Sequence, residues 1–245
     1  MTLIAALEGK DGLILASDSR GTIGDPRGLT AINDVHKKIF SLSKYCGIAT
    51  AGSAELNNQL IYSFTKRLEG EDVIGIEEIV QEFFKFSRST FQEWFGEKPF
   101  VSHGQPIVDQ RPTMTFILAG YGKRGNGNKK IYLLSSNLDF APQLCTSGHM
   151  LAGVPQYATY LIHRFYNPEM KLPHIKSLAA FLIQETATQD PKVGGPIRMA
   201  QITVKNGYKE LEEDEIMTIV TKNEDQNGKM KDFFFKKPAK KGKRK

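Results

Sequence analysis

Apolar residues change their spacing several times along the chain, and each change marks a new group of elements. Short apolar runs come first and predict strands over residues 3–7, 13–17, 38–42 and 45–51. Asp11-Gly12 lies between the first two runs and is typical of a hairpin turn. From residue 54 the apolar residues recur at helical spacing and predict two helices. The second carries a broad stripe of phenylalanines over residues 76–95, which we expect to lie in the core.

The second half of the chain repeats this change from strands to helices. Its apolar pattern predicts, in order, strands over 114–119, 130–135 and 138–145, helices over 155–166 and 175–188, strands over 198–204 and 208–211, and a short helix over 213–220. The segments 21–34 and 99–112 are rich in glycine, proline and polar residues and are predicted to be loops.

The order of these elements predicts an α+β fold. Each group of strands needs cover on its apolar face, and the simplest arrangement is two antiparallel sheets face to face with a helix pair outside each. This is a four-layer αββα sandwich. Separate α+β domains are the alternative, but no linker divides the chain, so we expect a single domain over residues 1–230.

Composition narrows the class of protein. A hydrophobic content of 40% and a charged content of 24% are ordinary for a globular protein, and no apolar run is long enough to span a bilayer. The two cysteines, Cys46 and Cys145, form no disulfide framework and no CxxC pattern. We therefore expect a cytoplasmic protein with reduced thiols, no metal, no cofactor and no membrane partner.

The net charge of +6 is concentrated at one end of the chain. Seven basic residues and no acidic residue occupy positions 236–245, so the rest of the chain has 33 − 7 = 26 basic residues against 27 acidic ones. We expect residues 231–245 to form a disordered basic tail, because like charges repel one another. Such a tail either keeps the protein soluble or makes weak, salt-dependent contacts with nucleic acid or an acidic partner.

The candidate chemistry begins at Thr2, directly after the initiator methionine. Removal of Met1 would place a hydroxyl and a free α-amine on one residue, a nucleophile beside its own base. The amine has an ordinary pKa of about 7.7–8.0, so part of it is neutral near neutral pH. Such a site also needs a carboxylate, a cation and a backbone N–H for the oxyanion that forms on attack.

Three residues at strand ends could supply these helpers. Asp18 follows the strand that the hairpin pairs with that of Thr2, Lys38 opens the next strand, and Gly52 ends the fourth. Taken singly, Asp18 is typical of a turn, Lys38 of a solvated surface and Gly52 of a strand-to-helix junction. Their joint occurrence behind Thr2 favours the catalytic interpretation.

The motifs around these residues resemble a known family. Residues 2–5 (TLIA), 10–12 (KDG), 16–20 (ASDSR), 36–40 (HKKIF), 49–54 (ATAGSA) and 194–203 (GGPIRMAQIT) follow the pattern of proteasome β-type subunits and of HslV-like bacterial homologues. These proteins are N-terminal nucleophile hydrolases, and their fold is the αββα sandwich. The resemblance extends over about residues 2–220.

The resemblance implies a role for each matching residue. Thr2 would be the nucleophile with its own amine as base, and Lys38 would hold a charge near the Thr2 hydroxyl. Asp18 would pair with Lys38, and the N–H of Gly52 would form the oxyanion hole. Arg20 would support the site.

Further matches concern the amine and the substrate. Asp190 would help to position the amine, and the pocket for the residue before the scissile bond would be bordered by Gly21, His36, Thr50 and Ala54. The chain departs from the family at Ala152 and Val193, where hydroxyl-bearing residues are usual. Thr146 or Ser147 would supply the missing hydroxyl if the alignment is shifted by a few residues.

These observations predict a threonine-type endopeptidase that cleaves unfolded polypeptide through an acyl-threonine intermediate. By resemblance it would work in a homo-oligomeric ring, with α-type subunits or an ATP-dependent unfoldase as possible partners. An amidase or transpeptidase on the same fold and a non-catalytic ring subunit are the alternatives.

Overall fold

The computed structural model describes residues 2–24, 30–69, 75–96, 111–125 and 127–235 of the 245-residue chain. The strands within these ranges are β1 (Leu3–Gly9), β2 (Gly12–Ser17), β3 (Gly21–Gly24), β4 (Thr30–Asn33), β5 (Ile39–Ser43), β6 (Cys46–Gly52), β7 (Met114–Gly120), β8 (Lys130–Ser135), β9 (Gln143–Leu144), β10 (His149–Gly153), β11 (Arg198–Thr203) and β12 (Gly207–Glu210). The helices are α1 (Ala54–Leu68), α2 (Ile76–Phe95), α3 (Gln156–Phe165), α4 (Leu172–Gln189) and α5 (Glu213–Phe235), with 3-10 turns at Lys123–Gly125 and Ser136–Leu138.

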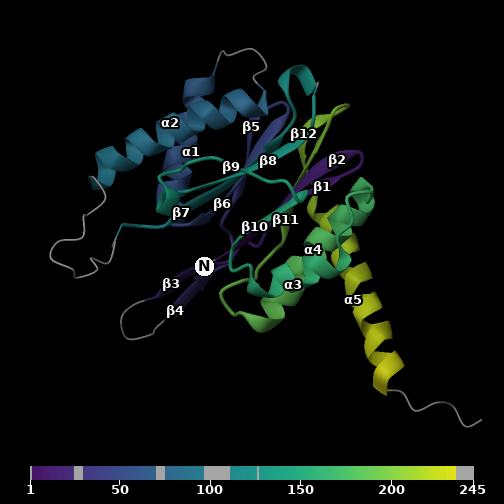
Figure 1. The fold of residues 1–245 in the computed structure, drawn as a ribbon. Coiled ribbons are helices and arrows are strands. Elements are labelled where there is room, and N and C mark those ends of the chain that lie inside the picture. The colour runs from purple at the N-terminus through teal and green to yellow at the C-terminus, as the bar shows by residue number, and fades with distance from the viewer. Residues whose placement is uncertain (1, 25–29, 70–74, 97–110, 126, 236–245) are drawn as a thin grey trace, which may run out of the picture.

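Two five-stranded antiparallel sheets form the centre of the molecule. The strand order is β10-β1-β2-β11-β12 in the first sheet and β5-β6-β7-β8-β9 in the second. The predicted hairpin joins β1 to β2, with Gly9 opposite Gly12. Helices α3 and α4 cover the first sheet and α1 and α2 cover the second, as Figure 1 shows. The predicted four-layer αββα sandwich is therefore confirmed.

Strand alternation divides the apolar side chains among three core layers. In β1, Leu3, Ala5 and Leu7 pack against α3 and α4, whereas Ile4 and Ala6 point into the layer between the two sheets. The stripe of phenylalanines in α2 packs on the second sheet, as expected, and Phe83 contacts both Phe64 and Phe116 at ring-centroid distances of 5.0 Å. Three separate layers of apolar contacts hold the two sheets in one unit.

Two strands occur where the sequence predicted a loop. Residues 21–34 contain the two-stranded ribbon β3–β4, in which Thr22 lies opposite Ile32. The ribbon projects from the body in Figure 1, and its apolar residues Ile23 and Ile32 are exposed. Because it packs on no apolar layer, its sequence lacks the alternation that predicts a half-buried strand.

The prediction of a strand over residues 138–145 was also wrong. Asp139 and Phe140 adopt left-handed backbone angles, with φ of 50° and 59°, and Pro142 follows them. Only the short strand β9 forms there. The chain then crosses to the first sheet and adds β10, which the sequence analysis missed, along the edge of β1.

The C-terminal helix is much longer than predicted. Helix α5 continues through Phe235, whereas the apolar pattern favoured an end near Val220. Its hydrogen bonds with α4 continue to Asn227, and the end of the helix extends away from the body (Figure 1). None of the described helices is both long and apolar enough to cross a membrane. Residues 236–245 and most of the predicted loop 99–112 lie outside the described ranges.

Candidate functional site

Thr2 lies at the edge of the layer between the two sheets. It precedes β1, and its carbonyl accepts a hydrogen bond of 2.8 Å from the N–H of Val154, just after β10. Strand alternation places its side chain on the same side of the sheet as Ile4 and Ala6. Thr2 is buried, and Met1 lies outside the described residues.

The end of β6 lies close to Thr2. Gly153, opposite Leu3 in the sheet, has a φ of +91°, and a Cβ atom there would overlap the carbonyl oxygen of Thr2 and contact the Cβ of Ala51. Gly153 therefore fills the narrow space between Thr2 and Ala51, which precedes Gly52. Gly52 is exposed and has a φ of +109°, a conformation that favours glycine.

Asp18 is fully buried and accepts four hydrogen bonds. Its Oδ1 accepts from the N–H of Leu3 at 3.1 Å and from Nζ of Lys38 at 2.8 Å. Its Oδ2 accepts from the N–H groups of Arg20 at 3.1 Å and Gly194 at 3.2 Å. One carboxylate thus connects β1, the entry to β5 and the segment before β11, and the oxygen that binds Lys38 also binds the residue next to Thr2.

Lys38 is held between the carboxylate and a backbone carbonyl. Its Nζ donates to Oδ1 of Asp18 and, at 2.7 Å, to the carbonyl of Arg20, and only about 6% of its side chain is exposed. Burial lowers the pKa of Lys38, and the charge of Asp18 partly opposes this effect. Burial likewise raises the pKa of Asp18, against the effect of Lys38 and of the backbone donors. The pair is a buried cation and carboxylate whose two pKa values move toward each other.

Arg20 binds a residue that the sequence analysis did not single out. Its guanidinium donates two hydrogen bonds of 2.9 Å to the carboxylate of Asp34 and one of 3.0 Å to the carbonyl of Pro191. Since the carbonyl of Arg20 binds Lys38, this clamp fixes one side of the lysine site. Asp34 closes the ribbon β3–β4 that starts after Arg20, so the clamp also holds the base of the ribbon. The spacing of residues in the sequence gave no sign of this clamp, because Asp34 ends a segment that was predicted to be a loop.

Two of the four expected pocket residues touch each other. A Cβ atom at Gly21 would overlap the ring of His36, so the backbone of Gly21 packs directly against that ring. The N–H of Thr50 donates to the carbonyl of Lys38 at 2.9 Å, which places Thr50 beside the lysine. Ala54 begins α1, two residues after Gly52.

Asp190 lies at the C-terminal end of α4. Its Oδ1 accepts a hydrogen bond of 2.8 Å from the N–H of Lys192, within the turn that leads to Val193. Among the hydrogen bonds of the described residues, none joins the Asp190 carboxylate to Thr2 or Lys38. Its expected role beside the amine therefore stays a prediction.

The two residues that depart from the family pattern, Ala152 and Val193, lie in apolar surroundings in the structure. Val193 is fully buried in the core beneath α4, and Ala152 is buried between the two sheets opposite Ile4. Ser147 lies beyond the far end of β1, near Leu7, and its hydroxyl donates to the carbonyl of His149. It is too far along the sheet to replace a hydroxyl near Thr2, so that expectation was wrong.

Ser17 is a further polar residue near the site. It lies opposite Ile4 at the end of β2 and is fully buried, and its Oγ has no hydrogen-bond partner within the described chain. Cross-strand partners point to the same face of a sheet, so Ser17 shares the inter-sheet face with Thr2. A serine that ends an apolar strand gives little signal in the sequence.

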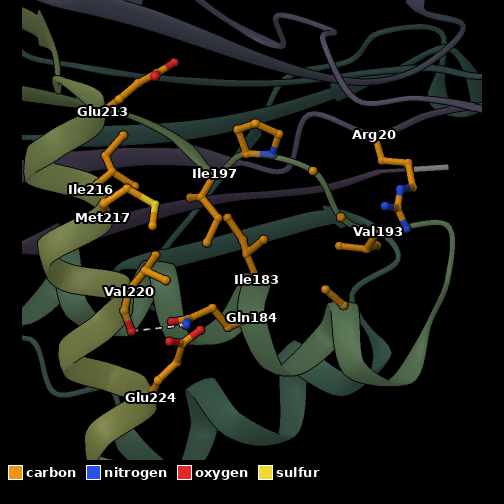
Figure 2. A pocket seen from close by; sticks show the side chains of 14 residues that line it. Arg20, Ile183, Gln184, Val193, Ile197, Glu213, Ile216, Met217, Val220 and Glu224 are labelled. Carbon is orange, nitrogen blue, oxygen red and sulfur yellow. Dashed lines mark hydrogen bonds between the residues drawn. The ribbon is translucent and has the colours of Figure 1, made fainter.

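A cavity of about 520 Å³ lies behind the hydrogen-bond network, between α4, α5 and the segment before β11 (Figure 2). Arg20 and Val193 line one side, and Ile216 and Val220 of α5 line the other. Gly194 also lines it and donates to Asp18, so the cavity adjoins the site through that residue. No group of three or more His, Cys, Asp or Glu side chains within the described ranges is arranged to hold a metal ion.

Comparisons with known proteins agree with this geometry. A family model described as "Proteasome subunit" matches residues 2–102. Among solved structures, "Anbu (ancestral beta-subunit)" from Yersinia bercovieri aligns with a TM-score of 0.72 at 15% identity, covering 96% of this chain and 98% of that one. An Anbu (Gly-1) mutant from Hyphomicrobium sp. strain MC1 aligns with a TM-score of 0.68 at 14% identity, covering 94% and 96%. A search of curated proteins found no match. The predicted resemblance is thus confirmed: the chain matches the proteasome subunit family over residues 2–102 and has the fold of proteasome-type N-terminal nucleophile hydrolases.

Proposed function

We propose that the protein is a threonine-type peptidase whose nucleophile is Thr2, exposed by removal of Met1. The observation that carries this proposal is the shared oxygen of Asp18. It binds Lys38 and the N–H of Leu3, so a buried cation is fixed beside the residue that would begin the mature chain.

The chemistry would follow from this arrangement in two steps. The Thr2 Oγ attacks the carbonyl carbon of a peptide bond while its proton passes to the α-amine. The N–H of Gly52 donates a hydrogen bond to the carbonyl oxygen, which stabilises the negative charge that develops there. The C–N bond then breaks as the leaving amine takes up the proton, and an acyl ester remains on Thr2. Water attacks this ester, releases the carboxylic acid and restores the hydroxyl.

Lys38 would assist by its charge. A cation close to the hydroxyl favours the alkoxide that forms as the proton leaves. Asp18 and the carbonyl of Arg20 orient the amine group of Lys38, and burial strengthens the electrostatic effect because water does not screen it. The same burial keeps the pKa of Lys38 below that of an exposed lysine.

The substrate would be an extended segment of unfolded polypeptide. We propose that it passes beside Gly21 and Gly52, with His36, Thr50 and Ala54 bordering the pocket for the residue before the scissile bond. The family match and the fold support assembly into a closed homo-oligomeric ring, which would limit access to unfolded chains. An α-type subunit or an ATP-dependent unfoldase would then deliver the substrate.

Hydrolysis of fluorogenic peptides by the wild type and by Thr2→Ala and Thr2→Ser tests the proposal. We expect Thr2→Ala to lose about 10³-fold or more in rate, as for removal of a covalent nucleophile, and Thr2→Ser to retain measurable activity. Full activity of Thr2→Ala would contradict the proposal. Product analysis in the presence of an added amine distinguishes hydrolysis from the amidase or transpeptidase alternative, in which the amine captures the acyl group.

A further inference from the structure

We propose that His149 and His163 form a pH-sensitive switch, which keeps β10 and α3 packed together at neutral pH and lets them separate in mild acid. The unit concerned consists of β10, the turn at residues 153–155 and α3. The two histidines, called the histidine pair below, are not among the residues proposed for catalysis. They lie at the end of this unit that is far from Thr2.

The first observation is that the turn between β10 and α3 holds Thr2. The N–H of Val154 donates a hydrogen bond of 2.8 Å to the carbonyl of Thr2, and a Cβ atom at Gly153 would overlap the same oxygen. Strand β10 ends at Gly153 and helix α3 begins at Gln156, so both elements leave from this turn. A change in how β10 and α3 pack on each other would therefore move the backbone that positions Thr2.

The second observation is a cluster of rings that joins the other ends of β10 and α3. The ring centroid of His149 lies 5.5 Å from that of His163 on α3 and 4.9 Å from that of Tyr166, just after the helix. Leu151, two residues after His149 in the strand, packs against the same layer of helices, so alternation directs both side chains toward α3. The Tyr166 hydroxyl donates to the carbonyl of Glu8 at 2.8 Å, which fixes the cluster to the end of β1.

The third observation is that the surroundings of His149 favour its neutral form. Its Nδ1 lies 3.1 Å from the carbonyl oxygen of Ser147, so this nitrogen carries the proton and donates it to the carbonyl. Within the part of the chain that the structure describes, no acceptor lies within hydrogen-bond distance of Nε2, where a second proton would bind. Burial lowers the pKa of His149, the carbonyl of Ser147 partly opposes this effect, and a charge on His163 lowers the pKa further.

The other ionisable groups around the histidine pair do not compensate a charge on His149. Burial raises the pKa of Tyr166 to about 12, so this side chain stays neutral. The carboxylate of Glu8 is paired with Lys129 at 3.4 Å, and the thiol of Cys145 lies 3.1 Å from the carbonyl oxygen of His149. Among the described residues, no carboxylate forms an ion pair with His149. Its charged form is therefore favoured only when β10 and α3 separate and water reaches the ring.

The direction of the pH effect follows from this difference between the closed and open unit. Burial lowers the pKa of His149 in the closed unit below the ordinary histidine value of 6.5, so opening takes up a proton. Opening is therefore independent of pH well above that value and becomes more favourable as the pH falls through it. Opening removes the hydrogen bond from Val154 to Thr2. On the proposed function, the site then loses activity in mild acid and recovers it when the pH is raised.

Amide hydrogen exchange of the full-length protein at about pH 7.5 and about pH 5.5, corrected for the intrinsic effect of pH, tests the proposal. We expect the protection of β10 and α3 to fall at least about tenfold in acid, while that of β6 and α2 stays the same. His149→Asn keeps a donor for the carbonyl of Ser147 but cannot gain a charge, so its protection should not change with pH. The matched control, His174→Gln, replaces an exposed histidine of α4 outside the pair and should respond to acid like the wild type.

Titration of the His149 ring in the wild type, followed by NMR, requires no variant. We expect a pKa below the ordinary value of 6.5, and a pKa at or above that value would overturn the proposal. Equal protection of wild-type β10 at the two pH values, or an acid effect of the same size in His149→Asn, would also overturn it. So would an acid effect that extends to β6 and α2, because the whole chain would then be unfolding. None of these measurements uses the reaction of Thr2, so a failure of the proposed peptidase activity would be distinguishable from a failure of the switch.

Discussion

At the residue scale, the site depends on a single buried carboxylate. Asp18 was predicted to belong to the site from its place at a strand end, and Lys38 from its place at the start of the next strand. The structure brings the two together at 2.8 Å. The sequence could not show the number of hydrogen-bond partners of Asp18, because three of its four donors are backbone N–H groups, and two of these, at Leu3 and Gly194, lie far from each other in the chain.

The change Asp18→Asn should destabilise the protein and the site together. An asparagine side chain offers one acceptor oxygen, so its NH2 group would face two N–H donors. Leaving both donors unaccepted costs about 1–3 kcal/mol each in unfolding free energy. Chemical denaturation measures this loss, and Asp190→Asn, which affects one bond in a surface turn, is the matched control. Equal stability of the two variants would contradict the role assigned to Asp18.

The pKa of Lys38 determines where activity falls at high pH. If the charge of Lys38 assists Thr2, activity declines as Lys38 loses its proton. Burial lowers the pKa of Lys38, so the decline should begin below the ordinary lysine value of about 10.4. The negative charge of Asp18 raises the pKa of Lys38, and therefore Asp18→Asn should move the decline to still lower pH. The pH profile of kcat/KM measures both effects, and a shift to higher pH in Asp18→Asn would refute this assignment.

Asp34 tests whether the clamp on Arg20 positions Lys38. Asp34→Asn removes the carboxylate that binds the guanidinium twice, and we expect the acylation rate to fall about tenfold, because small displacements of catalytic groups are costly. Asp34→Glu should recover part of the rate. The control is Lys37→Gln, which removes a neighbouring exposed ion pair with Glu210. Single-turnover rates that are equal in Asp34→Asn and the control would show that the clamp is dispensable.

At the scale of elements, the spacing of apolar residues was sufficient to predict a strand or helix wherever that element buries one face. Strands β1, β2 and β6 and helices α1 and α2 follow from their apolar spacing, and Asp11-Gly12 identified the first hairpin. The pattern failed for the ribbon β3–β4, which packs on no core layer, and for β10, which joins the edge of β1 from a distant part of the chain. Such pairings depend on the assembled sheet rather than on local preference.

Helix α5 shows how tertiary contacts extend an element. Its apolar spacing fades after Val220, yet polar contacts with α4 continue to Asn227. Asn223 is buried, and its amide joins Ser177 and Gln184. These bonds hold the middle of the helix where apolar packing does not.

Asn223→Ala should loosen this helix without disabling the site. The change leaves partly buried groups of α4 without their partners, at a cost of about 1–3 kcal/mol in unfolding free energy. Lys222→Ala, at an exposed neighbouring position, is the control and should change little. Thermal denaturation together with amide hydrogen exchange in α5 measures the effect. Unchanged exchange in α5 would show that the network does not secure the helix.

At the scale of the whole molecule, the apolar layers that stabilise the fold are separate from the residues of the candidate site. The outer layers of helices bury large side chains, whereas Thr2 and Lys38 lie at the edge of the layer between the sheets. The order of strand and helix groups predicted this architecture, because each sheet needs cover on its outer face. The position of the site at one end of the inter-sheet layer became visible only with the strand register.

Phe83→Ala tests this separation. Phe83 is fully buried among Phe64 and Phe116, and its truncation should cost about 3–5 kcal/mol in unfolding free energy. Reaction of Thr2 per folded molecule should stay as in the wild type, since the outer core does not contact the site. Phe84→Ala, at a partly exposed position on the same helix, should cost less. A fall in the reactivity of folded Phe83→Ala would indicate that the layers are coupled.

The most direct test of the central claim is the mass of the N-terminal peptide after reaction with a peptide epoxyketone. This reagent forms a ring that uses both a hydroxyl and an amine of one residue, so it reports the pairing that we propose for Thr2. We expect Met1 to be absent, the adduct to lie on Thr2, and Lys38→Ala to slow its formation. Retention of Met1 on the folded protein, or an adduct on another residue, would contradict this claim.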